Sequence, residues 1–196
     1  SASLLLVLLS AIGIWRFART RAEAALPPLE VVPMAAMPGF ESDPAFSPDG
    51  NQVAFAFGAK GDRCGIYTVM VDGDKPLRLT NGPGDAFPTW SPDGRRVAFY
   101  RFSEHGNAIY TVPALGGMEQ RLHTGFSGPW AFGLDWSPDG KVLALSESQE
   151  DKNRAWITLL SLADSAIHPL TSPSNQEYDS APAFSPDGSK VVFIRG

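Results

Sequence analysis

Ser47-Pro48-Asp49-Gly50 is the stretch that decides the fold, because the chain repeats it three more times. The copies begin at Ser91, Ser137 and Ser185, so the steps from one serine to the next are 44, 46 and 48 residues. An aromatic residue precedes each copy, and a short apolar run follows each copy three residues after its glycine. A recurrence at this period indicates one structural unit that has been copied.

Each unit has the content of four short strands. Proline fixes φ at the second turn position, aspartate can bond nearby backbone, and glycine accepts a positive φ, so the repeated stretch predicts a hairpin turn. In the first unit we expect strands ending at Phe46 and covering 52–57, 66–71 and 77–80. We therefore predict an all-β fold, a β-propeller of four-stranded antiparallel blades. About three and a half blades are present by this count, which makes the ring incomplete.

The repeats align well along the chain. The third strand at 66–71 matches 109–112 in the second repeat and, in altered form, 156–159 in the third, where we align Thr158 with the earlier threonines. Residues 29–32 resemble the last strand of a repeat, so we expect them to close a ring within a longer chain. The propeller is placed at 29–196, with repeats near 40–81, 82–125, 126–173 and 174–196.

An apolar leader precedes the repeats. Residues 1–15 carry no charge, and Arg16 follows them. Such a helix would rise only about 22 Å against a hydrocarbon core of about 30 Å, and the chain begins without Met. We favour a transmembrane helix at 1–21 with its start missing; a signal peptide and a buried helix are the alternatives. Residues 22–28, which contain two prolines, predict a stiff linker.

Composition and motifs exclude several classes of function. The net charge of −5 gives no electrostatic footprint for nucleic acid, and the single Cys64 excludes an internal disulfide framework. No P-loop, dinucleotide fingerprint or cysteine cluster occurs. His105, His123 and His168 fall in different repeats without the spacing of metal ligands. We therefore expect no cofactor, no metal site and no catalytic residue in this chain.

Two sets of acidic residues recur at fixed places in the repeats. The acid three residues before the proline of the first strand is Glu41, Asp85 or Asp179, and the third repeat has Ala131 there. In a closed propeller these acids could meet at the channel mouth and bind a cation or a peptide amine; capping and solubility are the alternative. The second set occurs in every repeat, so we interpret it as structural: Asp49 with Gly50, Asp93 with Gly94, Asp139 with Gly140, and Asp187 with Gly188.

The third repeat carries the most distinctive aromatic residues. Phe126, Trp130 and Phe132 precede its turn, close to Trp136. Most of this patch is expected in the core, and part of it could form an exposed interaction surface.

The repeats together resemble a known family. The pattern x-x-Pro-x-[Phe/Trp]-Ser-Pro-Asp-Gly, followed by Ile-Tyr-x-Val and Leu-x-Leu-Thr, resembles the TolB-like, WD-repeat-like β-propellers of bacteria. Placed after an apolar segment, it is similar to the C-terminal part of membrane-anchored winged-helix regulators or serine/threonine kinases of acidobacterial type. This resemblance implies a single-pass inner-membrane protein whose propeller lies outside the cytoplasm. It further implies that the propeller senses a ligand or binds a protein or peptide.

The resemblance leaves two other functions open. The propeller could gate a prolyl-oligopeptidase-like hydrolase, or the chain could be a periplasmic TolB-like scaffold. Nucleic acid would be bound only through a further N-terminal domain, which these 196 residues do not contain.

Overall fold

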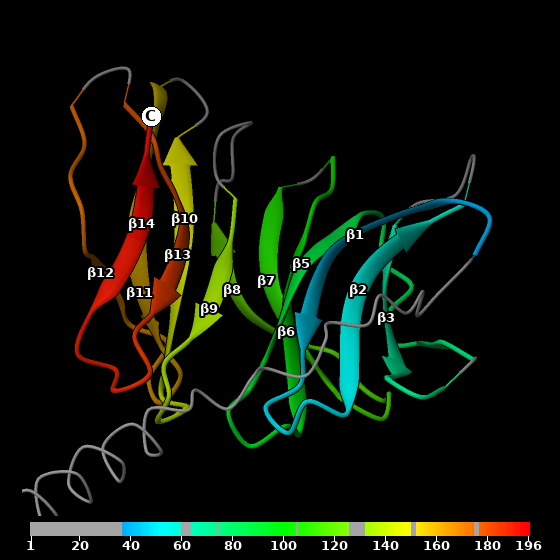
Figure 1. Ribbon diagram of the computed structural model, residues 1–196. Coiled ribbons are helices and arrows are strands. Elements are labelled where there is room, and N and C mark those ends of the chain that lie inside the picture. The colour runs from blue at the N-terminus through cyan, green and yellow to red at the C-terminus, as the bar shows by residue number, and fades with distance from the viewer. Residues whose placement is uncertain are drawn as a thin grey trace, which may run out of the picture. The chain divides into compact units, whose positions relative to one another are not determined.

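The computed structural model shows a protein built from β-strands (Figure 1). In the part of the chain that it describes, there are fourteen strands and no helix, which confirms the all-β prediction. The predicted helix at 1–21 and the linker at 22–28 lie outside the described residues. The residues described are 37–59, 64–73, 75–104, 106–125, 132–149, 152–174 and 177–196.

The strands form four antiparallel sheets, three of them with four strands each. Within each sheet, neighbouring strands follow one another along the chain, which is the up-and-down order of a propeller blade. The first strand of each sheet packs against the first strand of the next. The strands are β1 Phe40–Phe46, β2 Gln52–Gly58, β3 Gly65–Met70 and β4 Leu77–Arg78; β5 Asp85–Trp90, β6 Arg96–Arg101, β7 Asn107–Pro113 and β8 Gln120–Gly125; β9 Leu134–Trp136, β10 Val142–Gln149, β11 Lys152–Ser161 and β12 Ile167–Pro169; β13 Asp179–Phe184 and β14 Val191–Arg195.

The repeated Ser-Pro-Asp-Gly stretch forms the turn between the first two strands of each sheet. In the first copy the Ser47 hydroxyl donates to Asp49 at 2.6 Å and accepts from the backbone N–H of Gln52 at 2.9 Å. Gly50 has a φ of 73°, in the left-handed region that disfavours residues with a Cβ. The serine hydrogen bond, reinforced by a backbone N–H, lowers the pKa of the turn aspartate in all four copies.

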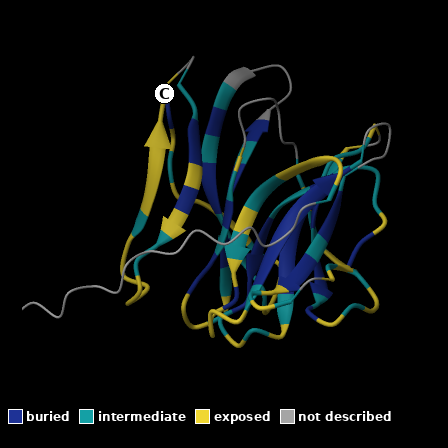
Figure 2. Ribbon diagram, turned by 45° about the vertical axis from the view of Figure 1, so that its right-hand side comes forward, coloured by how far each residue is buried: buried dark blue, intermediate teal, exposed yellow. Residues whose placement is uncertain are grey.

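The core lies between sheets because side chains of a strand alternate between its two faces. Val97 and Phe99 of β6 belong to the cluster shared with the first sheet, whereas Ala98 and Tyr100 belong to the cluster shared with the third. Figure 2 shows β6 as mostly buried, whereas β14 is mostly exposed. On β14, Val192 is 64% exposed.

The innermost strands share a backbone feature that the sequence did not reveal. Asp43, Phe87 and Ala181 stand just before the proline of β1, β5 and β13, and have positive φ angles of 55°, 52° and 51°. The strand pairing of all three sheets shifts at this point, as in a β-bulge. In the third sheet the matching residue is Gly133, where an added Cβ would lie 2.6 Å from the Cα of Ala181.

The register of the third sheet corrects one alignment made from the sequence. Ile157 pairs with Ser146 on β10, in the way that Ile66 pairs with Ala56 on β2. The residue equivalent to Thr68 is therefore Leu159, and Thr158 stands one position earlier. Aligning the repeats by their threonines was wrong, because the buried isoleucine is the residue that occupies the same position in both sheets.

Candidate interaction site at the junction of the second and third sheets

The acid of the second repeat is enclosed by partners from two sheets. The Asp85 side chain is completely buried and accepts hydrogen bonds from Arg101 Nε at 2.7 Å and Nη2 at 2.9 Å. The hydroxyl of Thr80, which follows β4, donates to the same carboxylate. Glu119 is a second carboxylate partner of Arg101, and the hydrogen bond that Arg101 donates to Asp85 is the main reason that the pKa of this arginine is raised.

The acid of the fourth repeat repeats this arrangement. Arg195 donates to Asp179 through Nε at 2.7 Å and Nη2 at 2.9 Å. Burial raises the pKa of Asp179, but the hydrogen bonds from Arg195 and Thr171 outweigh burial and hold it below its ordinary value. Both carboxylates are thus occupied within the protein, so a cation or amine would have to displace a guanidinium group.

Glu41 differs from the other two acids because it is exposed. Its Oε1 accepts a hydrogen bond from the backbone N–H of Met37 at 3.2 Å. The residue that pairs with it on β2 is Phe57, where the second and fourth sheets have arginine. Glu41 is therefore the one member of the predicted set that solvent reaches freely, and binding by the set stays a prediction.

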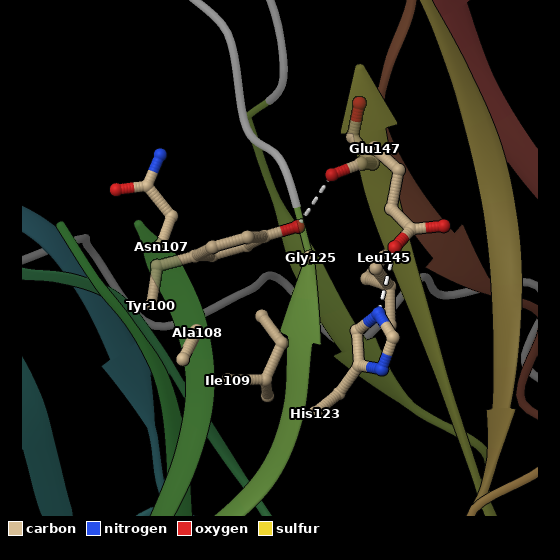
Figure 3. A pocket seen from close by; sticks show the side chains of 9 residues that line it. Tyr100, Asn107, Ala108, Ile109, His123, Gly125, Leu145 and Glu147 are labelled. Atoms are coloured by element: carbon tan, nitrogen blue, oxygen red, sulfur yellow. Dashed lines mark hydrogen bonds and ion pairs between the residues drawn. The ribbon is translucent and has the colours of Figure 1, made fainter. Parts of the chain in front are cut away.

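The junction of the second and third sheets has other residues in the places of Asp85, Arg101 and Thr80. The position of Asp85 falls on Ala131, outside the described residues, and the positions of Arg101 and Thr80 hold Glu147 and His123. Figure 3 shows the two side chains meeting across the junction, with His123 Nε2 at 2.8 Å from Glu147 Oε1.

Glu147 has a second partner within its own sheet. Its Oε2 accepts a hydrogen bond from the Thr158 hydroxyl at 2.7 Å. The His123 and Glu147 side chains keep 16% and 12% of their surface exposed. The junction therefore holds a histidine–glutamate pair in place of the acid–arginine cluster, and the pair is about as exposed as the Arg101 side chain, which is 14% exposed.

Tyr100 forms the wall beside this pair. Its hydroxyl donates to the backbone carbonyl of Ser146 at 2.7 Å, which joins the second sheet to the third (Figure 3). Burial raises the pKa of Tyr100 far above its ordinary value, and the negative charge of Glu147 adds to that effect. Tyr100 therefore remains a neutral hydrogen-bond donor at any physiological pH.

An aromatic cluster continues from Tyr100 toward the surface. The ring of Phe87 lies 6.1 Å from that of Tyr100, 6.4 Å from Phe102 and 5.7 Å from Phe132. Phe132 keeps 41% of its surface exposed. The other two members of the predicted aromatic surface, Phe126 and Trp130, lie outside the described residues.

The structure also locates the remaining candidate ligands. His123 and His168 lie in strands and not in loops, because the fourth strands extend over them. His105 lies outside the described residues, and Cys64 is a half-buried free thiol. Among the described residues, no group of three or more histidine, cysteine or acidic side chains is arranged to hold a metal ion.

Comparison with models of protein families shows the family to which the chain belongs. Residues 16–196 match the model described as PD40, the TolB beta propeller domain. The chain belongs to the TolB β-propeller domain family. The propeller fold and the TolB-like resemblance inferred from the repeats are thereby confirmed.

Relatives of this TolB-like propeller include proteins of different function. It is 31% identical over 153 residues to the uncharacterized peptidase YuxL of Bacillus subtilis (strain 168), covering 78% of the chain and 21% of YuxL. It is 32% identical over 164 residues to the Tol-Pal system protein TolB of Francisella tularensis subsp. mediasiatica (strain FSC147), covering 80% of the chain and 35% of that protein.

A solved structure gives the same relationship. The TolB-like chain superposes on the crystal structure of TolB from Acinetobacter baumannii with a TM-score of 0.63 and 26% identity, covering 78% of this chain and 37% of the other. The chain spans about a fifth of YuxL and about a third of each TolB protein. Within its described residues no helix is long and apolar enough to cross a membrane, and the predicted span at 1–21 lies outside them.

Proposed function

We propose that this TolB-like propeller is a protein- or peptide-binding module that carries no catalytic site of its own. The observation that supports the proposal is the exchange of the acid–arginine cluster for His123 and Glu147 at the junction of the second and third sheets. Residues that repeat in every unit serve the architecture of a repeat protein, so a residue that departs from the pattern is available for another role.

The chemistry around the junction suits recognition of a polypeptide. Phe132 offers a partly exposed aromatic ring held from behind by Phe87, and aromatic anchors supply much of the binding energy of protein interfaces. Glu147 and His123 lie at the same junction, and a bound peptide would exchange one of the hydrogen bonds that His123 and Thr158 now make to Glu147. An apolar anchor beside a small polar group is the usual composition of an interface centre.

Peptide selection on the full chain tests this function. We expect random-peptide display to enrich sequences whose binding the Phe132→Ala substitution weakens at least tenfold. Leu115→Ala is the matched control, because Leu115 is an 83% exposed apolar residue in the turn after β7. Selection that enriches no sequence, or peptides bound equally by the Phe132→Ala variant, would contradict the proposal.

The cellular setting forms a second part of the proposal. We infer a propeller tethered outside the cytoplasm of a bacterial regulatory protein. The apolar segment 1–15 supports the tether, and the resemblance to TolB-like proteins supports the side of the membrane, whereas Arg16, Arg19 and Arg21 by themselves favour the cytoplasmic side. A reporter fused after Gly196 tests the topology: activity of a periplasmic reporter is expected, and activity of a cytoplasmic reporter would overturn the placement.

The similarity to YuxL supports an alternative function. A propeller that covers 78% of this chain and is 31% identical occurs in a protein named as a peptidase, so the chain could gate the active site of a hydrolase. The complete reading frame distinguishes the two: a downstream Gly-x-Ser-x-Gly motif with later Asp and His residues would favour the hydrolase.

A further inference from the structure

Arg154 on β11 has a hydrogen-bonding group that the protein does not use. Its Nε is buried and has no hydrogen-bond partner, and its guanidinium carbon lies 5.7 Å from the centre of the Trp156 ring. A buried donor without a partner destabilises the folded state, so such a group calls for an explanation in the structure or in a ligand.

Four other arginines of the described chain, two of them exposed, do not share this feature. Arg101 and Arg195 use Nε to donate to aspartate, and Arg96 uses it to donate to Thr111. Arg78, although more exposed, donates its Nε–H to the backbone carbonyl of Thr80. The fold thus supplies an acceptor to the Nε of these four arginines and leaves that of Arg154 without one.

A cavity lies beside the Arg154 side chain, although its buried Nε is turned away from that space. Its volume is about 240 Å³, and it is lined by Arg154, Trp156, Pro169, Thr171, Ser172 and Pro173. None of these lining residues carries a negative charge, so the cavity wall does not neutralise the guanidinium group. The indole and the two prolines make the rest of the wall apolar and rigid.

Thr171 is a lining residue of the cavity that also binds the neighbouring strands. Its hydroxyl already accepts a hydrogen bond from the backbone N–H of Ile157 at 2.9 Å and also lowers the pKa of Asp179. It is therefore committed to the junction of the third and fourth sheets. Ser172, which is exposed, is the hydroxyl left for a ligand among the lining residues.

We propose that this cavity binds the terminal carboxylate of a peptide whose last residue is apolar. A carboxylate matches the planar fork of a guanidinium group, and a turn of the Arg154 side chain toward it would give the unused Nε an acceptor. An apolar side chain next to the carboxylate would pack against Trp156 and the prolines. The inference rests on the proposed peptide-binding function and adds a second contact point to it, on a different junction from His123 and Glu147.

N-acetyl-leucine is the probe that tests the site on the full chain. It carries a free carboxylate and an apolar side chain, and N-acetyl-leucine amide is the same molecule without the charge. Two-dimensional NMR of the arginine Nε–H and tryptophan indole N–H groups reports directly on Arg154 and Trp156. We expect saturable shifts of both signals with the acid, and binding at least tenfold weaker with the amide.

Two substitutions separate the site from a general effect of charge. Arg154→Gln is expected to weaken binding of the acid at least tenfold, while Arg121→Gln, which removes an exposed arginine on β8, leaves it unchanged. Equal binding of acid and amide, or equal loss in both variants, would overturn the proposal. Tighter binding of inorganic phosphate than of N-acetyl-leucine would also overturn it, because the cavity would then select a phosphate and not a peptide end.

The N-acetyl-leucine experiment and the peptide-display experiment can fail independently of each other. If N-acetyl-leucine binds at Arg154 but no displayed peptide depends on Phe132, the proposed junction site fails and the carboxylate site stands. If displayed peptides depend on Phe132 and N-acetyl-leucine causes no saturable shift, the carboxylate site alone fails.

Discussion

The buried acid–arginine pair of the second repeat gives the sharpest test of how the sheets are joined. Replacing Asp85 with asparagine leaves the Arg101 guanidinium, which is 14% exposed, without its main partner. Breaking a buried pair from one side typically costs about 3–5 kcal/mol. Because Arg101 retains Glu119, we expect the Asp85→Asn variant to lose about 2–3 kcal/mol of unfolding free energy.

The fourth repeat supplies the matched control for this experiment. Asp179 makes the same two hydrogen bonds, but its partner Arg195 is 46% exposed, so water can solvate the guanidinium when the acid is removed. Asp179→Asn is therefore expected to cost about 1 kcal/mol. Urea denaturation of the full chain measures both variants, with the slope of the transition as a check on the unfolded state. An Asp85→Asn loss equal to or smaller than that of Asp179→Asn would refute this reasoning.

Two further predictions use pairs of residues that differ in one feature. Trp90 Nε1 donates to the Ala45 carbonyl at 2.9 Å, whereas Trp136 Nε1 is buried without a partner in the described structure. Trp90→Phe should therefore destabilise the chain by about 1 kcal/mol more than Trp136→Phe in thermal unfolding; the reverse order would count against it. In an NMR titration, Asp187 should ionise with a pKa of about 2, because hydrogen bonds from Ser185 and the backbone hold it below its ordinary value of 3.8. Asp135 should ionise with a pKa above 3.8, because burial disfavours its charged form. Because the folded pKa of Asp187 is depressed, its stabilising effect is complete above pH 4 and is lost as the pH falls toward 2; a pKa above that of Asp135 would contradict this.

The fold could be predicted from the sequence because its signals are local. Each Ser-Pro-Asp-Gly stretch contains the three residue types that a hairpin turn requires, and the apolar run after it marks the second strand. The bulges could not be predicted in this way. Phe87 and Ala181 carry a Cβ and still adopt a positive φ, so packing against the neighbouring sheet sets their conformation against their local preference. The glycine at 133 is the single sequence signal of this feature.

The candidate site was only partly predictable, because the acids were compared without their partners. In the first, second and fourth repeats the residue that pairs with the acid position stands sixteen residues later, on the second strand. Arginine stands there in the second and fourth repeats, as Arg101 and Arg195, and each binds the acid of its own repeat. Acid and arginine thus occur together in two repeats, whereas the first repeat keeps the acid Glu41 opposite Phe57, and comparing single positions misses this signal.

The same comparison explains why the third repeat is the informative one. Its pair of positions holds Ala131 and Glu147, so the negative charge has moved from the first strand to the second. An arginine at the second position would have no acid to bind, and Glu147 instead meets His123, which replaces the threonine of the other junctions. The hydrogen bond between His123 and Glu147 keeps the second and third sheets joined. The junction therefore retains its structural role and gains the polar groups that recognition requires.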